Sequence, residues 1–271
     1  MPELPEVETT KRGIMPHLAD QTIERVVVRQ SQLRWPVTST LNDQLTNQKL
    51  LSITRRGKYL LLKIHQGTLL IHLGMSGSLR ILETTVSPQK HDHIDIVFKN
   101  GKTLRYTDPR RFGAFLWVDG NPLLHPLLSK LGVEPLESCF TSTYLLTHAQ
   151  RRTLPIKSFI MDHHIVVGIG NIYATEALFL AKIHPLTPAN TLSQKQMEAL
   201  TSAIGCILNE AIQQGGTTLK DFVNTEGKPG YFFLKLKVYG RAGQPCVVCH
   251  SPLETLRIGQ RATVYCSFCQ Q

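Results

Sequence analysis

The chain contains no run of apolar residues that approaches the ~18 needed to cross a membrane, and no internal repeat or low-complexity tract. Its first residues, MPELPEVE, are acidic and rich in proline, so they lack the basic start and apolar stretch of a secretory signal. We therefore expect a soluble, cytoplasmic protein. With 271 residues, of which 42% are hydrophobic, the chain can form one large domain or two ordinary ones.

Acidic residues are also in short supply, because 20 Asp and Glu stand against 30 Lys and Arg, a formal net charge of +10. A basic excess of this size indicates a polyanionic partner, and nucleic acid is the commonest one. The excess is distributed along the chain instead of forming a basic tail, so several parts of the protein are candidates to face phosphate. A solvated basic surface explains the charge alone equally well.

The six cysteines are unevenly placed, and four of them form a C-x2-C-x16-C-x2-C pattern at the C-terminus: Cys246, Cys249, Cys266 and Cys269. In a reducing compartment this spacing predicts one tetrahedral zinc ion, because each C-x2-C knuckle presents two thiolates on one side of a tight turn. The intervening residues suit a β-hairpin whose folding depends on the metal. Four sulfur ligands make the site closed and therefore structural. We expect the other two, Cys139 and Cys206, to be buried apolar residues.

The first half of the chain is typical of a short helix followed by strands. A helix is predicted over residues 2–17, with acidic residues in the first turn, where the helix dipole favours them. Short strands at near-regular spacing then predict an antiparallel sandwich or barrel. The β-branched and alternating runs, separated by turn signals, lie at residues 22–29, 59–64, 68–72, 93–98, 103–106 and 114–118.

From about residue 131 the pattern becomes helical. Ser193 and Gln196 form a capping box ahead of apolar residues at helical spacing. Upstream, helical stretches at 156–163 and 172–181 are separated by the turn VVGIGN. Such a turn suits a phosphate clamp, because backbone N–H groups and the next helix N-terminus point at an anion, although many glycine-rich turns are only packing devices.

Glycine and proline are frequent in residues 215–233, GGTTLKDFVNTEGKPGYFF, which also contain several polar residues. This composition favours a mobile loop, and loops of this kind often carry function. A plain connector between two elements fits the composition as well.

Taken together, the motifs occur in one order along nearly the whole chain: MPELPEVET, RRGKYLLL, HLGMSGSLR, KHDH, YTDPRRFGA, GIGNIYATEALF, GGTTLKDF and QRATVYCSFCQ. This order resembles the bacterial formamidopyrimidine-DNA glycosylases, which remove 8-oxoguanine and ring-opened purines. The resemblance implies an α+β multidomain protein that acts as a monomer on double-stranded DNA containing oxidised purines or abasic sites. It implies an N-terminal antiparallel β-sandwich catalytic domain with an N-terminal helix (1–131), a helix–two-turn–helix domain (132–237) and a zinc-finger hairpin (238–271).

The same resemblance implies imine chemistry at Pro2. Once Met1 is removed, which a small second residue favours, Pro2 is a secondary amine with a pKa near ~8, so a usable fraction is nucleophilic at neutral pH. Attack at C1′ would expel the base, and the resulting iminium would make the C2′ proton acidic, leading to β,δ-elimination. The resemblance makes Glu3 an acid or base near the sugar, Glu6 a support of the site and Lys58 a proton donor. It makes Arg261 a catalytic residue that sits at the phosphate and assists the δ-elimination. From the residues alone, the two glutamates could equally be first-turn helix acids, and the two cations surface charges.

A glycosylase must also take its target base out of the stack, which needs an apolar wedge and a group to pair with the orphaned base. The family positions that fill the gap match Met75, Arg110 and Phe112, although Met75 and Phe112 would otherwise be read as core residues. Phosphate contacts, which position DNA without reading its sequence, match His91, Arg152, Lys157, Asn171 and Arg261. The loop that covers the lesion matches residues 217–231, including Thr217, Thr218, Lys220 and Tyr231.

This sequence departs from the family pattern at a few positions. His250 follows Cys249 where the family usually has glycine, and we expect a slightly altered knuckle turn there. Arg152 stands where lysine is common, which keeps the charge. His163 and His164 replace more typical neutral residues before the two-turn motif, either adding pH-dependent phosphate affinity or lying as solvated surface side chains.

Two other functions compete with the purine enzyme. The sister family that removes oxidised pyrimidines has the same fold and proline nucleophile, but usually begins PEGPE. This chain has PELPE and the GGTTLKDF segment, which favour the purine enzyme. The alternative from another class is a DNA-binding protein that uses the helix pair and zinc ribbon without breaking bonds.

Overall fold

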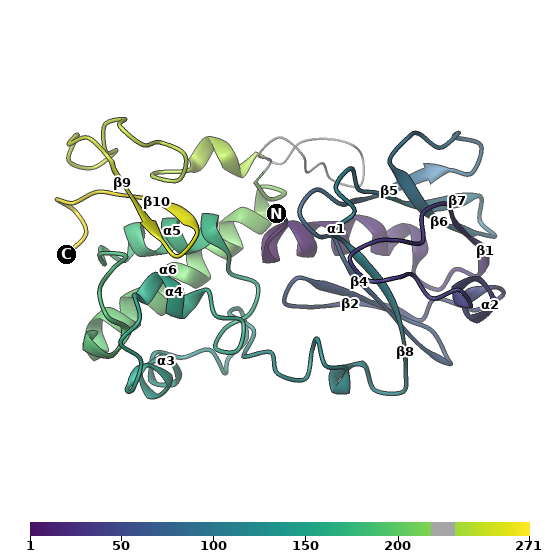
Figure 1. Ribbon diagram of the computed structural model, residues 1–271, viewed down its shortest axis with the longest axis horizontal. Helices are drawn as coiled ribbons and strands as arrows, with labels where there is room; N and C mark the ends of the chain where they lie inside the picture. Colours follow the sequence, from purple (N-terminus) through teal and green to yellow (C-terminus); the bar gives the residue numbers. More distant parts are fainter. Residues whose placement is uncertain (218–230) are drawn as a thin grey trace. The chain divides into compact units, whose positions relative to one another are not determined.

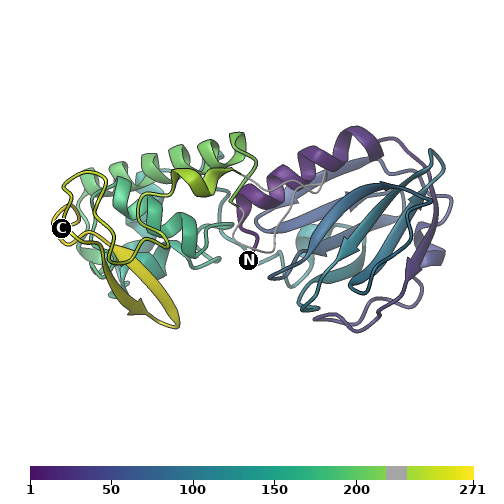
Figure 2. The same cartoon turned by 90° about the horizontal axis from the view of Figure 1, so that it is seen from above.

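The computed structural model describes residues 1–217 and 231–271 (Figures 1 and 2). The chain divides into two compact units. Met1–Ser129 and Gln214–Phe233 make up the first unit, and Lys130–Gln213 and Leu234–Gln271 make up the second. Among the described helices, none is both long and apolar enough to span a membrane.

The first unit consists of two antiparallel four-stranded sheets with a helix, α1 (Leu4–Leu18), packed alongside both (Figure 2). One sheet has the order β1-β6-β7-β5, formed by Ile23–Val28, Asp92–Phe98, Lys102–Thr107 and Ser78–Glu83. The other has the order β2-β3-β4-β8, formed by Ser52–Arg56, Tyr59–Lys63, Gly67–His72 and Ala114–Asp119. Two short helices, α2 (Leu41–Leu45) and η1 (Pro122–Leu124), also belong to the described part of this unit. The predicted antiparallel sandwich with an N-terminal helix is confirmed.

The core of this unit follows from the two-residue period of its strands. Ile94 and Ile96 on β6 and Leu104 on β7 are buried in one cluster with apolar residues of the second sheet and of α1. Because successive side chains point to opposite faces, Asp95 and Arg105 lie on the other face of the same strands, directly opposite each other in the register. The alternation therefore places a charged pair on the face of the sheet that points away from the apolar core.

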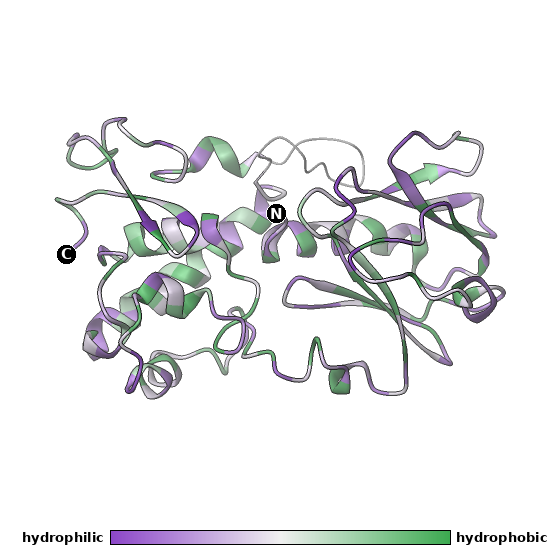
Figure 3. Cartoon of the chain, in the orientation of Figure 1, coloured by the Kyte–Doolittle hydropathy of each residue, from purple (hydrophilic) through white to green (hydrophobic). Residues whose placement is uncertain are grey.

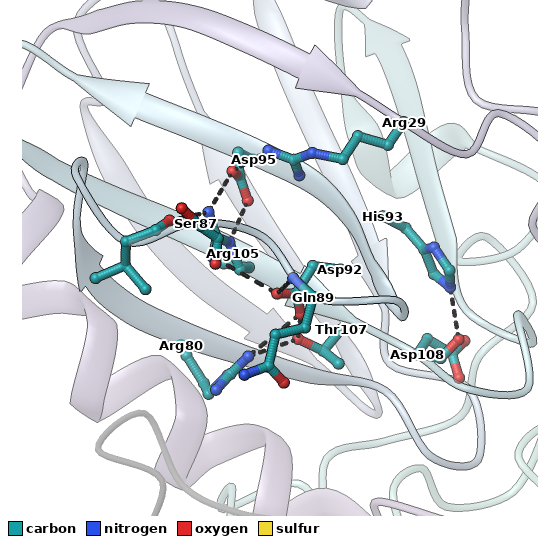
Figure 4. Close-up of polar contacts among 11 residues, drawn as sticks. Arg29, Arg80, Ser87, Gln89, Asp92, His93, Asp95, Arg105, Thr107 and Asp108 are labelled. Carbon is teal, nitrogen blue, oxygen red and sulfur yellow. Dashed lines mark hydrogen bonds and ion pairs between the residues drawn. The ribbon is translucent and has the colours of Figure 1, made fainter.

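Arg105 is buried and grips Asp95 with two hydrogen bonds, from Nε to Oδ1 and from Nη2 to Oδ2, both 2.8 Å (Figure 4). Arg29 also reaches Asp95, and Arg80 reaches the neighbouring Asp92 at 3.2 Å. Burial alone would raise the pKa of Asp95, but the hydrogen bonds from Arg105 and Arg29 outweigh it and hold that pKa below its ordinary value. The sheet thus keeps an ionised carboxylate inside.

The second unit is built from four helices and a hairpin: α3 (Ser142–Ala149), α4 (Ile156–Ile160), α5 (Asn171–Leu180), α6 (Gln194–Gln213), β9 (Glu254–Ile258) and β10 (Arg261–Tyr265). Two short helices, η2 (Ala189–Thr191) and η3 (Phe232–Lys235), are also present, the second at the border of the two units. Hydrophobic and hydrophilic residues both occur around α6 (Figure 3), which buries one face. The capping box predicted ahead of it is confirmed, because Ser193 N–H donates to Gln196 Oε1 at 3.0 Å and Gln196 N–H donates to Ser193 Oγ at 3.3 Å.

The structure differs from the sequence prediction in several local features. Helix α4 ends at Ile160, earlier than predicted, because the Asp162 carboxylate accepts the His164 N–H and the His163 carbonyl accepts the Gly132 N–H. Strands β2 and β5 were not predicted, since the charged SITRR and the glycine-flanked SLRILE give weak strand patterns.

The prediction that the two isolated cysteines are buried is wrong, because both are exposed. Cys206 lies on α6 between the buried positions Ala203 and Ile207, so the helical period turns its side chain outward. Cys139 precedes α3 in a turn.

We predict that Arg105→Met will lower the free energy of unfolding by about 3–5 kcal/mol, because it removes the bidentate partner of a buried carboxylate. Urea unfolding followed by tryptophan fluorescence measures this, since Trp35 and Trp117 both lie in the first unit. Lys102→Met is the matched control: its pair with Glu83 is solvent-accessible, so the expected change stays within about 1 kcal/mol. Equal losses in the two variants would contradict the prediction.

Candidate functional site

The N-terminus of the first unit is fixed by a reciprocal capping box. Glu3 is the N-cap residue of α1, and its backbone N–H donates to Glu6 Oε2 at 2.7 Å while its own carboxylate caps the helix in return. Pro2, Glu3 and Glu6 are all buried. The predicted catalytic residues of the N-terminus therefore lie together, and the nitrogen of Pro2 is held at the start of a helix.

The second oxygen of Glu6 holds a segment far along the chain. Glu6 Oε1 accepts the Thr217 N–H at 2.8 Å, and Thr217 pairs with Tyr231 in an antiparallel bridge. Gly216 has a φ of +85°, and a Cβ there would lie 3.0 Å from Glu6 Oε1, so this close approach requires glycine. Two other predicted loop residues, Thr218 and Lys220, lie outside the described residues.

Two neighbouring loops present large side chains to solvent. Met75, between β4 and β5, is 40% exposed, and Phe112, between β7 and β8, is 42% exposed. The Arg110 guanidinium carbon lies 4.9 Å from the centre of the Phe112 ring. Exposed large apolar side chains at adjacent loops mark an interaction surface, so these residues are not part of the core.

A buried carboxylate that sequence reasoning missed joins these two loops. Asp108 accepts hydrogen bonds from Ser76 Oγ at 2.7 Å, from the Tyr106 hydroxyl at 2.8 Å and from the Gly113 N–H at 3.0 Å. The backbone N–H of Arg110 donates to it at 3.2 Å. The only sequence signal was the Asp-Pro pair in YTDPRRFGA, which marks a turn but not a link to another loop.

The backbones of these loops also touch directly. Gly74 has a φ of +70°, and a Cβ there would lie 2.5 Å from the Phe112 carbonyl carbon. His91, a predicted phosphate contact, borders the same group, because its carbonyl accepts the Asp108 N–H at 3.0 Å. The structure therefore brings His91 and the three predicted gap-filling residues to one region of the first unit.

A pocket of about 510 Å³ lies beside these loops and is lined by Met1, Leu33, Arg34, His72, Gly74, Met75, Arg111 and Phe112. Burial, together with the positive charges of Lys58 and Arg34, lowers the pKa of His72 to about 4. His72 is therefore a neutral ring at neutral pH, and its Nδ1 accepts the Gly74 N–H at 3.0 Å. Lys58 lies in the tight turn between β2 and β3, close enough for its charge to act on this ring.

In the second unit, a buried lysine joins three elements. Lys157 on α4 is 1% exposed, and its Nζ donates to Asn171 Oδ1 and to Thr263 Oγ1, both at 2.7 Å. Asn171, the first residue of α5, donates from Nδ2 to the Ala262 carbonyl at 3.1 Å. Both of these acceptors are uncharged oxygens. Thr263 was missed by sequence reasoning, because nothing in QRATVYC marks its hydroxyl as an acceptor.

A pocket of about 240 Å³ opens between the end of α4 and the β9–β10 turn. Its lining residues are Lys157, Ser158, Met161, Asp162, Ile258, Gly259, Gln260 and Arg261. Arg261 is exposed at the start of β10. Three predicted phosphate contacts, Lys157, Asn171 and Arg261, are therefore brought together, whereas Arg152 is exposed before α4 and does not line this pocket.

The four C-terminal cysteines converge, and their sulfur atoms all lie within 4.8 Å of one another. Cys246 Sγ is 3.9 Å from Cys269 Sγ, and Cys249 Sγ is 3.4 Å from Cys266 Sγ. A tetrahedral zinc ion with Zn–S bonds of ~2.3 Å needs sulfur atoms ~3.8 Å apart, so the cluster fits such an ion. These residues could therefore hold a metal ion.

The chain next to this cluster has a special conformation at one residue and is tied to α5 at another point. His250 adopts a φ of +62° directly after Cys249, a left-handed conformation that glycine takes more easily, which explains the usual glycine there. Glu176 on α5, buried and missed by sequence reasoning, accepts the N–H groups of residues 237–239 at 2.7–3.0 Å. The segment that leads into the cysteine cluster is thereby tied to α5.

Comparisons with known proteins match the whole chain. The model of the "Formamidopyrimidine-DNA glycosylase N-terminal domain" family matches residues 1–115, and that of the "Formamidopyrimidine-DNA glycosylase H2TH domain" family matches residues 131–223. The formamidopyrimidine-DNA glycosylase of Nitrosococcus oceani is 53% identical over 270 residues, covering 100% of both chains. The chain belongs to the formamidopyrimidine-DNA glycosylase family.

Other members of the formamidopyrimidine-DNA glycosylase family give the same picture. The enzyme of Legionella pneumophila strain Philadelphia 1 is 56% identical over 270 residues, covering 100% of this chain and 98% of its own. The MutM (Fpg) crystal structure from Thermus thermophilus matches with a TM-score of 0.87 and 36% identity, covering 99% of this chain and 98% of its own. Lactococcus lactis Fpg in complex with DNA containing an abasic site matches with a TM-score of 0.92 and 32% identity over 99% of each chain.

We predict that Thr263→Val will destabilise the packing of β10 against α4 by about 1–3 kcal/mol, because a buried ammonium loses one of its acceptors. Thr263→Ser, which keeps the hydroxyl, is the matched control and should retain most of the stability. Native-state hydrogen exchange of the β10 amides measures both variants. If the valine and serine variants exchange alike, the hydroxyl does not support Lys157.

Proposed function

We propose that this protein is a base-excision repair enzyme, a DNA glycosylase and abasic-site lyase that removes 8-oxoguanine and formamidopyrimidines from double-stranded DNA. The observation that carries the proposal is the 53% identity, over the full length of both chains, to a formamidopyrimidine-DNA glycosylase. Solved relatives support the substrate class, because Lactococcus lactis Fpg was crystallised with DNA containing N7-benzyl-Fapy-dG and with DNA containing an abasic site.

In this proposal, Pro2 is the nucleophile once Met1 has been removed. Its amine nitrogen bonds to C1′ as the bond from C1′ to the base breaks and the base leaves with a proton. The bond from C1′ to O4′ then breaks and O4′ takes up a proton, so that the opened sugar carries an iminium at C1′. Loss of the C2′ proton then expels the 3′ phosphate, and a second elimination expels the 5′ phosphate. Support comes from the burial of Pro2 and from the capping box that fixes the residue directly after it.

The neighbouring charged groups take distinct roles. Glu3, adjacent to the nucleophile, acts as acid or base near the sugar, and Lys58 donates a proton in the lyase steps. Glu6 is a positioning residue, since its two oxygens accept N–H groups from Glu3 and Thr217. Thr217 and Tyr231 then bracket the segment proposed to cover the flipped base, with Thr218 and Lys220 among its contacts.

The exposed side chains of the two loops fill the space that the flipped nucleotide leaves. Met75 and Phe112 act as apolar wedges, and Arg110 pairs with the edge of the orphaned base. Their exposure and the Asp108 link between their loops support this role.

Phosphate binding is assigned to groups from both units: His91, Arg152, Lys157, Asn171 and Arg261. Support comes from the hydrogen bond between Lys157 and Asn171 and from the pocket that Lys157 shares with Arg261. Contacts to phosphate position any duplex without reading its sequence, which suits an enzyme that must search all DNA.

The four C-terminal cysteines hold one zinc ion in this proposal. The ion supplies folding energy to a hairpin that is too short to form a core of its own.

The proposed functional parts are the catalytic domain (1–131), the helix–two-turn–helix domain (132–237) and the zinc finger (238–271). The protein acts as a monomer in the bacterial cytoplasm, where its DNA substrate lies.

We predict that borohydride will trap the wild-type protein covalently on DNA containing 8-oxoguanine opposite C, because the iminium is reduced to a stable amine. Pro2→Gly should give far less adduct. Pro16→Ala, late in α1, is the control and should trap normally. The intact mass must first show that Met1 is absent; a processed wild type that gives no adduct would rule out the imine mechanism.

Stronger excision of thymine glycol than of 8-oxoguanine would instead assign the pyrimidine-specific function.

We predict that zinc chelation, or Cys266→Ser, will abolish DNA binding and leave the first unit folded, because the finger that carries Arg261 depends on the metal. Tryptophan fluorescence reports the first unit, and fluorescence anisotropy of labelled DNA reports binding. Cys206→Ser is the matched control, since this exposed cysteine lies outside the cluster. Tight DNA binding after verified loss of zinc would contradict a role for the metal.

A further inference from the structure

We propose that Asp162, His163 and His164 form a second metal site, which takes an exchangeable divalent ion of the Zn²⁺ or Ni²⁺ class and presents it to phosphate. These residues follow α4 directly. One ligand atom from each lies within 4.8 Å of the others, and Asp162 Oδ1 is 2.9 Å from His164 Nδ1. The rings of His163 and His164 lie side by side, with centroids 4.2 Å apart.

The donor atoms select the class of ion. Two imidazole nitrogens and one carboxylate oxygen are ligands that Zn²⁺, Ni²⁺ and Cu²⁺ prefer, whereas Mg²⁺ and Ca²⁺ require mostly oxygen. The set also differs from the four thiolates at the C-terminus, which hold zinc tightly in a closed site. Three protein ligands leave coordination positions open to water or to an anion, so this second site is exchangeable.

The backbone that carries these ligands is held in place. The Asp162 carbonyl accepts the N–H groups of Ile165 at 2.9 Å and Val166 at 3.1 Å, and the His163 carbonyl accepts the Gly132 N–H at 2.8 Å. A Cβ on Gly132 would lie 2.2 Å from the Ile165 carbonyl oxygen, so the two backbones pack against each other. A fixed backbone reduces the entropy lost when the side chains close on an ion.

The side chains themselves are accessible. The His164 side chain is 53% exposed and the Asp162 side chain 28% exposed, so an ion reaches them without unfolding. The two donors already in contact, Asp162 Oδ1 and His164 Nδ1, need only a small outward movement to share an ion at bond lengths of ~2.0–2.2 Å.

This cluster lies at the 240 Å³ pocket between the end of α4 and the β9–β10 turn. Asp162 lines the 240 Å³ pocket together with Lys157 and Arg261, and it is the acidic residue of that lining. A divalent ion on Asp162 replaces a negative charge at this pocket with a net positive one. The ion therefore strengthens phosphate binding, both by this charge and through an open coordination position. This effect on DNA rests on the proposed function, whereas metal binding itself does not.

The test uses the full chain with its zinc retained and verified, titrated with Ni²⁺ in the absence of DNA. We expect wild type to bind one Ni²⁺ beyond the zinc, and His163→Asn/His164→Asn to bind it at least about tenfold more weakly. His65→Asn/His148→Asn, which removes two exposed histidines elsewhere, is the matched control and should bind like wild type. Asp162→Asn, which keeps an acceptor for the His164 N–H, should also bind more weakly. Equal Ni²⁺ binding by all variants, or none by wild type, overturns the site.

A second measurement tests the connection to phosphate. Ni²⁺ should tighten the binding of undamaged duplex DNA to wild type and to the His65→Asn/His148→Asn control, but not to His163→Asn/His164→Asn. An equal change of DNA affinity in all three proteins overturns the placement of the ion at the pocket that contains Lys157 and Arg261. Because the Ni²⁺ titration contains no DNA and the borohydride assay contains no Ni²⁺, failure of this site and failure of the glycosylase proposal are read separately.

Discussion

A buried carboxylate must find hydrogen-bond donors, and the sites of this protein are organised around that requirement. Glu6 satisfies it with the N–H groups of Glu3 and Thr217, which lie at opposite ends of the first unit's sequence. Asp108 does the same for two loops, and Glu176 for the segment that leads into the cysteine cluster. In each case an acidic side chain on a regular element, or next to one, accepts donors from an irregular segment. The irregular segments that carry functional side chains are thereby given fixed positions.

Cationic side chains are used in a complementary way. In the sheet, Arg105 neutralises Asp95 at a directly opposite register position, so that charge serves stability. Lys157 is equally buried, and it donates hydrogen bonds to the uncharged oxygens of Asn171 and Thr263. These two buried cations therefore differ in the chemistry of these partners, a carboxylate for Arg105 and neutral oxygens for Lys157.

Much of this arrangement was predictable where the signal is local. The convergence of the four cysteines, the Ser193 capping box and the strand at residues 93–98 each depend on neighbouring residues, and all three were confirmed. Asp108, Thr263 and Glu176 were missed because their roles come from contacts with distant segments. Cys206 was assigned to the interior from its residue type, although its position on α6 turns it outward. Most of the site residues matched by family motifs lie near one another in the structure. Arg152 lies apart from the pocket of Lys157 and Arg261, and Thr218 and Lys220 lie outside the described residues.

The bond between Lys157 and Thr263 also constrains the order in which the second unit is completed. The two residues are 106 positions apart, and Thr263 lies close to the end of the chain. During synthesis α4 and α5 emerge before β10, so the ammonium has its Asn171 acceptor first and gains Thr263 only after β10 has been made. Because a buried ammonium that lacks one of its acceptors is destabilised, docking of β10 completes the burial of Lys157. The second unit therefore reaches its final packing only when the hairpin docks.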